Sequence, residues 1–365
     1  MMRHLSLLFI PLLLVACQPG KTGMSSDTGD TLAMRYARNL TIVDYDNHSE
    51  VTLRNPWDST KTLATYCLYE RGSERPSSSS VAVAVPVSSA AVFSTMHCAL
   101  LHELQADQTI TGICDPEYNH LPYINKGIAD GRIHNLGNSM DPNLEQVMNL
   151  MPEVLMPSPF ENSGGLGRIE ALGIPIIWCA DYMEVSPLAR AEWIRFYGRL
   201  FGKGELADSI FGEVEHRYTE LRDKAATASH RPRLLPEMPW NGQWTLPASG
   251  STSAQLYADA GADYIFSDLE GAGSIPLSTE HVVEKGMTAD VWLIKHHGAL
   301  SRAQIVTDTP LLATIKAPVW WCNTSSSPLY EETPFHPELL LECLMAILHP
   351  ELDIRPERQY FQPLQ

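Results

Sequence analysis

The chain has 365 residues, of which 44% are hydrophobic and 19% charged, and its formal net charge is −17. This length supports two sizeable hydrophobic cores. The acidic balance argues against nucleic acid as a partner, because phosphate binding requires clustered lysine and arginine, and against a polybasic membrane contact.

The N-terminus has the pattern of a bacterial lipoprotein signal. Arg3 precedes an apolar run over residues 5–16, which is too short to span a bilayer but has the length of a signal-peptide core. The run ends in Leu14-Val15-Ala16-Cys17, which resembles the lipobox. We therefore expect cleavage before Cys17 and lipidation of its thiol, which would anchor the protein in a membrane. An ordinary secretory signal with a chance cysteine is the alternative.

Residues 34–68 alternate β-rich runs with turns and predict a small β meander that packs on the first lobe. A repeating pattern of helices and strands follows, which is typical of a parallel sheet covered on both faces. Strands are predicted at 81–85, 90–94, 109–113, 153–156 and 175–179, and helices at 98–104, 144–150 and 187–201.

A long helix near the middle of the chain separates two similar halves. Its apolar positions recur at steps of three or four, as expected for one stripe along a helix. They are Leu206, Ile210, Val214, Tyr218, Leu221 and Ala225. Pro232 ends the helix, because the residue before a proline disfavours helical geometry. Beyond it, strands are predicted at 233–238, 263–266, 291–294 and 319–323, and helices at 253–260 and 337–348.

The predicted fold is α/β, with two lobes that are each a parallel-sheet αβ sandwich, joined by one long α-helix. A single large doubly wound sheet is the alternative. The predicted divisions are a signal peptide (1–16), a Gly/Ser/Thr-rich tether (17–33), an N-terminal lobe with the meander (34–202), the linking helix (203–229) and a C-terminal lobe (230–365).

Aromatic, histidine and methionine residues are frequent just past the predicted strands. Ligands of parallel α/β sheets bind beyond the carboxyl ends of strands, and large aromatic surfaces suit a large planar or apolar ligand. Core packing is the competing interpretation for each residue. The predicted ligand contacts are Met96, His97, Tyr118, Phe160, Trp240, Trp244, His296 and Trp321.

Catalytic motifs are absent from the sequence, so we expect neither enzymatic activity nor a cofactor of its own. The segment that begins with His102-Glu103 lacks the second histidine of a zinc-protease helix, and there is no G-x-S-x-G elbow. Metal ligation by His296 or His297 remains open at this stage. The pairing of the six cysteines that follow Cys17 does not emerge from their spacing.

Several short sequence segments, in their order along the chain, resemble those of substrate-binding proteins of ABC importers for metal chelates, the class that serves iron-siderophores, haem and cobalamin. The resemblance covers about 81–350 and includes Leu172-Gly173-Ile174-Pro175, Leu277-Ser278-Thr279-Glu280 and Ala289-Asp290-Val291-Trp292. It implies a lipid-anchored, extracytoplasmic protein that carries a chelate in an inter-lobe cleft to a permease dimer with its ATPase. An iron-siderophore is favoured. Cobalamin or haem, or free zinc or manganese, are the alternatives.

The resemblance also implies a docking role for Glu145 and Glu280, each near the start of a predicted helix. One glutamate per lobe would meet an arginine on each permease subunit. The competing interpretation is that each carboxylate is simply favoured by the dipole of its helix.

Overall fold

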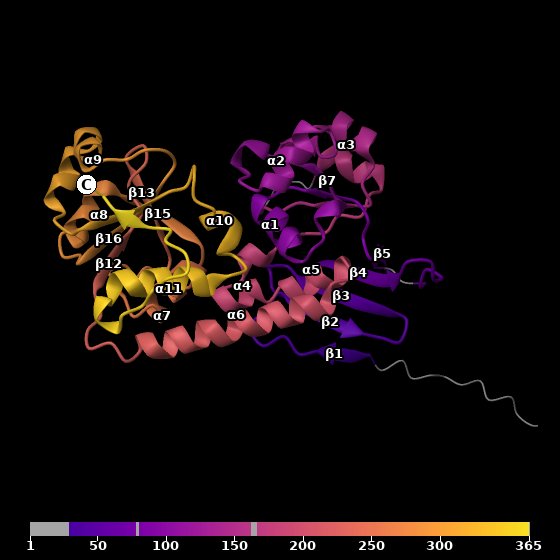
Figure 1. Cartoon of the computed structure of the whole chain (residues 1–365), viewed down its shortest axis with the longest axis horizontal. Coiled ribbons are helices and arrows are strands. Elements are labelled where there is room, and N and C mark those ends of the chain that lie inside the picture. The colour runs from indigo at the N-terminus through magenta and orange to yellow at the C-terminus, as the bar shows by residue number, and fades with distance from the viewer. Residues whose placement is uncertain (1–28, 78–79, 162–165, 365) are drawn as a thin grey trace, which may run out of the picture.

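The computed structural model describes residues 29–77, 80–161 and 166–364. Two lobes lie side by side along the long axis of the molecule, and one long helix, α6 (Gly204–Ala225), runs beneath both of them (Figure 1). This arrangement confirms the predicted fold class. The predicted lipobox and Cys17 lie outside the described residues.

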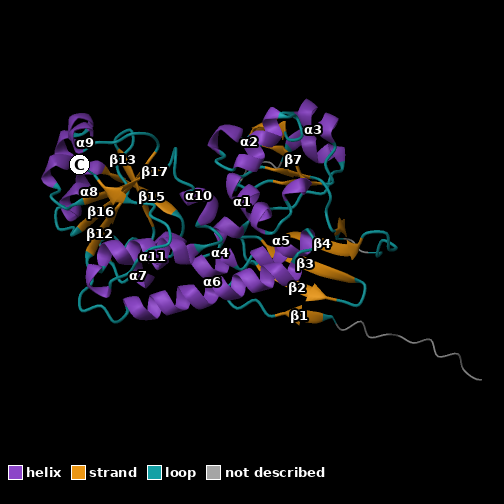
Figure 2. Cartoon of the chain, viewed as in Figure 1, coloured by secondary structure: helices purple, strands orange, loops and turns teal. Residues whose placement is uncertain are grey.

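A five-stranded accessory sheet lies beneath the first lobe (Figure 2). Its strands follow the order β1 (Asp30–Leu32), β2 (Leu40–Asp44), β3 (His48–Arg54), β4 (Thr62–Glu70) and β5 (Val81–Val85). Strands β2 to β4 match the predicted meander. Two expectations are corrected. Strand β1 occupies three residues of the predicted tether, and β5 pairs in parallel with β4 instead of opening the αβ pattern.

The first lobe, lobe 1, is built on a four-stranded parallel sheet. Its order is β11 (Val154–Met156), β6 (Ala90–Val92), β7 (Ile110–Ile113) and β8 (His134–Asn135), with β9 (Gly137–Asn138) and β10 (Asp141–Pro142) pairing separately. Its helices are α1 (Thr95–Glu103), α2 (Pro122–Ala129) and α3 (Leu144–Leu150). The strand predicted at 175–179 forms only an isolated bridge, between Ile176 and Leu155.

The connection between the lobes is helical. The helix predicted over 187–201 is two short helices, α4 (Pro187–Ala191) and α5 (Ile194–Leu200). The buried stripe of α6 consists of Ala207, Phe211, Val214, Tyr218, Leu221 and Ala225. The predicted positions Leu206 and Ile210 are only partly buried. Ala207 and Phe211 are buried instead, because successive steps of four drift around a helix of 3.6 residues per turn. Alternating steps of four and three stay on one face.

The second lobe, lobe 2, contains a five-stranded sheet in which only the last strand is antiparallel. Its order is β14 (Asp263–Tyr264), β12 (Arg233–Pro236), β16 (Val291–His296), β17 (Val319–Asn323) and β18 (Gln362–Pro363). A separate antiparallel pair is formed by β13 (Gln243–Pro247) and β15 (Ser274–Ser278). The helices are α7 (Thr252–Asp259), α8 (Thr279–Gly286), α9 (Arg302–Asp308), α10 (Leu329–Glu332) and α11 (Pro337–Leu348).

One hydrophobic cluster extends through most of the molecule. It includes Leu53 of the accessory sheet, Val92 of lobe 1, Tyr218 of α6 and Leu293 of lobe 2. A smaller cluster in lobe 1, around Val147, packs α3 against its sheet. The lobes also contact each other directly, because α10 packs against α1.

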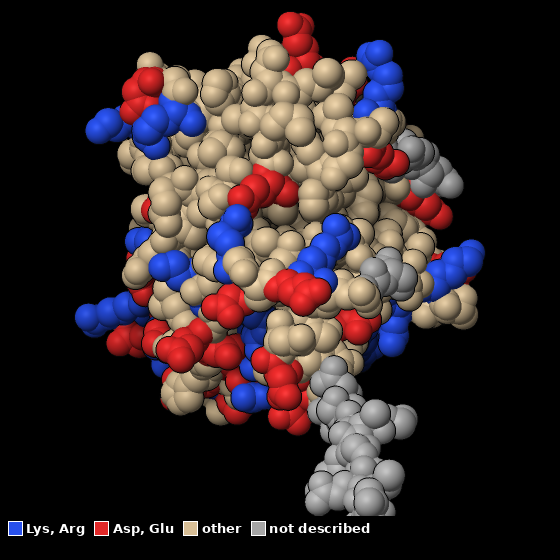
Figure 3. Space-filling model, turned by 90° about the vertical axis from the view of Figure 1, so that its right-hand side faces the viewer, with Lys and Arg blue, Asp and Glu red and all other residues tan. Residues whose placement is uncertain are grey.

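Charged side chains of both signs are intermingled on the face in Figure 3, mostly over its lower part. This face therefore offers no continuous basic field to a nucleic acid. Among the described helices, none is long and apolar enough to cross a membrane. The cysteines of the described part of the chain are all buried free thiols, namely Cys67, Cys98, Cys114, Cys179, Cys322 and Cys343.

Candidate functional site

The carboxyl ends of the parallel strands in the two lobes approach each other across the gap between the lobes. In lobe 1 the parallel strands β6, β7 and β11 end at one edge, and in lobe 2 β12, β16 and β17 do the same. Tyr118, which follows β7, lies edge-on to His297, which follows β16, with ring centroids 6.3 Å apart. We call the space between these edges the inter-lobe cleft.

Lobe 1 contributes a cavity of about 280 Å³ to the cleft. Its lining consists of Phe93, Ser94, Thr95, Asp115, Tyr118, Ser139, Ser158 and Phe160. All of these residues except Ser139 lie in segments that follow strands β6, β7 and β11. Tyr118 is 56% exposed and Phe160 is 43% exposed. The cavity thus combines free aromatic faces with a set of hydroxyl groups.

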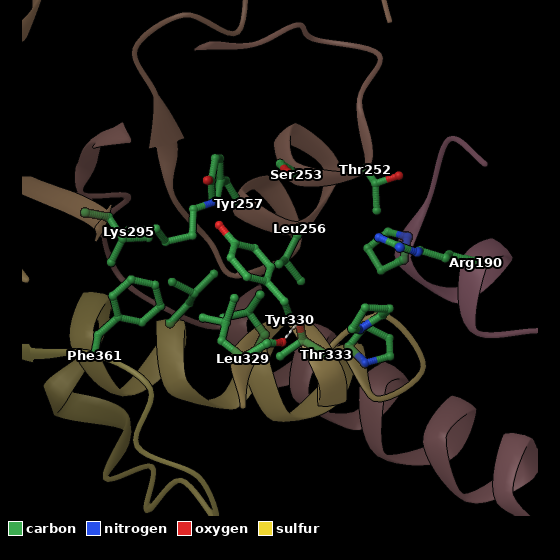
Figure 4. Close-up of a pocket in the computed structure, with 16 residues that line it drawn as sticks. Arg190, Thr252, Ser253, Leu256, Tyr257, Lys295, Leu329, Tyr330, Thr333 and Phe361 are labelled. Atoms are coloured by element: carbon green, nitrogen blue, oxygen red, sulfur yellow. Dashed lines mark hydrogen bonds between the residues drawn. The ribbon is translucent and has the colours of Figure 1, made fainter. Parts of the chain in front are cut away.

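Lobe 2 contributes a cavity of about 140 Å³ beside the carboxyl end of β16. The ring of Tyr330 lies in its middle with the hydroxyl pointing toward Lys295, and Arg190 lies on the opposite side (Figure 4). Thr252 and Ser253, in the first turn of α7, also line it. This cavity offers N–H and O–H donors above an apolar floor that includes Leu340 and Leu344 of α11.

Both cations of this second cavity are paired with carboxylates. The Nζ of Lys295 lies 2.6 Å from Oε1 of Glu237, and Nε of Arg190 lies 3.2 Å from Oδ2 of Asp181. Burial favours loss of the Lys295 proton, but the charge of Glu237 outweighs burial and raises the pKa of Lys295. Lys295 therefore stays charged, and the Glu237 carboxylate beside it compensates that charge. The cavity thus presents N–H and O–H donors and the ring of Tyr330, and each of its two cations lies beside a carboxylate.

Five of the predicted ligand contacts lie on segments that border the cleft. Tyr118 and Phe160 line the lobe 1 cavity. Trp240 is 76% exposed in the turn between β12 and β13. Met96 is partly buried, with its Sδ 2.9 Å from Nη2 of Arg190. His296 is partly buried at the end of β16, and its Nδ1 lies 3.3 Å from the Gly298 carbonyl oxygen.

Three predicted contacts are buried in the interior, and the structure corrects their placement. His97 is fully buried, and its Nε2 lies 2.9 Å from Oδ1 of Asp181. Trp244 is fully buried with its ring centroid 5.8 Å from that of Trp292.

Trp321, at 9% exposure, lies in the middle of β17. Strands place alternate side chains on opposite faces, and this register turns the indole of Trp321 into the core. These three side chains have little or no exposed surface to offer a ligand.

Four residues of the lobe 2 cavity were not predicted from the sequence as ligand contacts, namely Arg190, Tyr257, Lys295 and Tyr330. Lys295 immediately precedes His296 at the predicted end of a strand, which was a usable signal. The other three lie on helices α4, α7 and α10, outside any motif, and reach the cavity only through tertiary packing.

A metal centre is not formed by protein side chains in the described part of the chain. No three histidine, cysteine, aspartate or glutamate side chains converge within residues 29–77, 80–161 and 166–364. His297 instead contacts Tyr118 through its ring.

Glu145 and Glu280 lie on different lobes in matching local settings. Each is exposed in the first turn of its helix, α3 or α8. Asn143 and Ser278 cap these helices through their side chains, so the helix starts are defined without the glutamates.

A family model described as periplasmic binding protein matches residues 99–318, which is more than half of the chain. The chain belongs to the periplasmic binding protein family. An uncharacterized lipoprotein of Methanocaldococcus jannaschii is 26% identical to this periplasmic binding protein over 318 residues, covering 80% of this chain and 75% of the relative.

Solved structures share the two-lobed fold of this periplasmic binding protein. A periplasmic haem-binding protein from Pseudomonas aeruginosa aligns with a TM-score of 0.59 at 15% identity, over 76% of this chain and 98% of the other. A periplasmic vitamin B12-binding protein of Vibrio cholerae aligns with a TM-score of 0.53 at 16% identity, over 74% and 99%. The resemblance seen in the sequence is thus confirmed as to family and fold.

Proposed function

We propose that this periplasmic binding protein binds a metal chelate in the inter-lobe cleft, with an iron-siderophore favoured, and delivers it to an ABC permease dimer with its ATPase. The observation that carries the proposal is the exposure of Tyr118, Phe160 and Trp240 on segments that follow strands at the two facing sheet edges. Large exposed aromatic side chains grouped around a concave site mark ligand-binding surfaces. The donors of Lys295 and Tyr330 suit the oxygen atoms that surround a chelated metal.

Cobalamin or haem is the alternative ligand for the same cleft. The solved structures named above are described as binding haem and vitamin B12, which supports a chelate as the ligand class. A free zinc or manganese ion is less well supported, because the described residues offer no group of three metal-ligating side chains.

The proposed location is the extracytoplasmic side of a membrane, with the lipid on Cys17 as the anchor. Membership of the family and the lipoprotein relative support this location. Glu145 and Glu280 are the proposed contacts with the two permease subunits.

The test of this function begins with the absorption spectrum of protein purified from its native cells. The protein is then titrated with haemin, cyanocobalamin and a ferric hydroxamate while tryptophan fluorescence is recorded. We expect one of the three to quench the fluorescence saturably. The proposal would be overturned if the purified protein carries no bound chromophore and none of the three compounds quenches its fluorescence.

A further inference from the structure

Two histidines bridge the lobes, and each has acceptors at both ring nitrogens. The Nδ1 of His120, in lobe 1, lies 2.6 Å from Oε1 of Glu331 on α10 of lobe 2. Its Nε2 lies 3.1 Å from the carbonyl oxygen of Ser325, in the loop after β17. The backbone N–H of His120 also donates to Glu331, at 3.1 Å.

His336 repeats this arrangement in the opposite direction. It precedes α11 of lobe 2, and its Nε2 lies 2.8 Å from both carboxylate oxygens of Glu103, on α1 of lobe 1. Its Nδ1 lies 2.8 Å from Oε1 of Glu338. Both bridges therefore join the lobes at the surface where α1 and α10 pack together.

The acceptors determine the charge state that each bridge needs. A neutral imidazole has one N–H donor, so one of its nitrogens would place a lone pair against an acceptor oxygen. An imidazolium donates from both nitrogens. His120 and His336 each satisfy all of their partners only in the protonated form.

The surrounding groups are mostly acidic. Besides Glu331, the ionisable groups around His120 are Cys98 of α1, which interacts with Glu331, Tyr118 two residues earlier in the same loop, and His297 of lobe 2, whose ring contacts Tyr118. The groove around His336 is also lined by His102 of α1, Glu213 and Arg217 of α6, Glu332 of α10, Glu342 of α11, and Glu357 and Arg358 of the C-terminal segment. Both arginines are already paired, Arg217 with Glu342 and Arg358 with Glu332.

His120 is close in the chain to the proposed ligand contact of lobe 1. It ends the loop that follows β7, and Tyr118 lies two residues earlier in that loop. Because His120 is anchored on lobe 2, the loop that carries Tyr118 is held at the edge of the cleft, where the ring of Tyr118 contacts that of His297.

We propose that His120 is a positioning residue whose protonated ring holds the Tyr118 loop on lobe 2, and that His336 is a second proton-dependent bridge, so that closure of the cleft takes up protons. The consequence for ligand affinity rests on the proposed function, but the closure itself does not.

The pH dependence follows from linkage. Burial lowers the pKa of His120, but the hydrogen bonds to Glu331 and Ser325 outweigh it and raise that pKa above its ordinary value. For His336, burial is outweighed by Glu103 and Glu338, which raise its pKa to about 10. A raised pKa stabilises the closed form fully below the ordinary histidine value of about 6.5, and this contribution is lost as pH rises through the raised value. Closure therefore weakens as pH rises above about 6.5 at both histidines, and the contribution of His336 continues to fall as pH approaches 10.

The experiment measures the distance between the lobes in the ligand-free, full-length protein. Lys126→Cys on α2 and Asp308→Cys on α9 provide exposed sites for spin labels, while the described native cysteines are buried. We expect a single short distance at pH 5.5 and a growing longer-distance population as pH rises above 7. A distance distribution that does not change between pH 5.5 and 9.5 would overturn the proposal.

Three variants separate the bridge from a merely structural role. His120→Gln should reduce the change in distance with pH, and His120→Arg, which keeps the charge, should hold the short distance at a pH where the wild-type protein already opens. His216→Gln is the matched control, because the Nδ1 of His216 lies 3.5 Å from Oε2 of Glu220 on the same helix, α6, so this variant should leave the curve unchanged. An unaltered curve in His120→Gln contradicts the assignment. If that variant fails to fold, the ring ¹⁵N shifts of His120 in the wild-type protein report its protonation directly.

Ligand binding forms a separate arm. If one of haemin, cyanocobalamin or a ferric hydroxamate binds, its Kd should rise by up to about tenfold per pH unit for each histidine that titrates on closure. A pH-dependent lobe distance without binding of any chelate would leave the bridges in place and refute only the proposed function. A bound chelate whose Kd does not vary with pH would refute the link to affinity.

Discussion

The fully buried carboxylate of Asp181 accepts hydrogen bonds of 2.9 Å from Nε2 of His97 and 2.9 Å from the hydroxyl of Tyr197. Arg190 adds a third contact, at 3.2 Å. Burial alone would raise the pKa of Asp181, but His97 and Arg190 outweigh it and lower the pKa to about 2. This cluster connects lobe 1 with the helices that lead to α6.

Asp181→Asn is therefore expected to destabilise the protein by about 3–5 kcal/mol, because it leaves buried partners without their counter-charge. Urea denaturation at pH 7 measures this loss. Since the pKa of Asp181 is depressed, its stabilising effect is present above the ordinary value of about 4 and is lost as pH falls toward 2. Asp107→Asn, in an exposed pair with His102, is the control and should change stability by less than about 1 kcal/mol.

Trp244 is expected to act in folding and not in binding. Trp244→Ala removes a fully buried indole that packs on Trp292 and donates to the Pro236 carbonyl at 3.1 Å. The resulting cavity should cost about 3–5 kcal/mol. Thermal unfolding followed by circular dichroism measures the effect. A melting temperature equal to that of the wild type would show that Trp244 is not a core residue.

Trp240 is expected to show the reverse behaviour. Its side chain is 76% exposed, so Trp240→Ala should leave the melting temperature within about 2 °C of the wild type. An aromatic anchor in a binding site contributes 2 kcal/mol or more, so the chelate Kd should rise at least about thirtyfold. Isothermal calorimetry at pH 6 is the measurement. Trp320→Ala, at a partly buried position in β17, tests for non-specific loss of an indole.

Docking is tested by the double change Glu145→Ala and Glu280→Ala. Both side chains are exposed and lie outside the two cavities, so chelate affinity and stability should not change. Uptake by cells should be abolished, because charges at the edge of an interface determine registration with the partner. Glu205→Ala, in the first turn of α6, is a control for loss of a helix-start carboxylate. Normal uptake by a stably expressed double mutant would refute the docking role.

The anchor is tested at Cys17, which lies outside the described residues. Cys17→Ser removes the only thiol of the predicted lipobox, so the precursor should accumulate uncleaved and unlipidated. Detergent-phase partitioning and the mass of the purified protein report the change. Normal processing of the variant would refute the lipobox assignment.

The predictable parts of the fold were those set by local pattern. The helix that became α6 and the strands that became β16 and β17 followed from periodicity and apolar runs. The interruption between α4 and α5 did not, because both segments share one apolar pattern and the break depends on packing. Strand β5 reads as an αβ strand locally, and only its pairing with β4 assigns it to the accessory sheet.

The candidate site was less predictable than the fold. Sequence position could place Trp240 and Trp244 near the same sheet edge, but not decide which indole faces solvent. That difference arises because β13 pairs with β15 and turns Trp244 toward Trp292, while Trp240 remains in the turn. Tyr330 and Arg190 meet in one cavity from α10 and α4, a contact that no local pattern encodes.

The unequal division of the apolar interior has a consequence for local stability. Helix α3 contacts only the smaller cluster, through Val147, Leu144 and Leu150. Its backbone amides can therefore open without disturbing the larger cluster, which supports α6 and lobe 2, and we expect them to exchange with deuterium well before those of α6. A helix that carries a proposed permease contact can then adjust to its partner by local loosening while α6 and lobe 2 keep their shape.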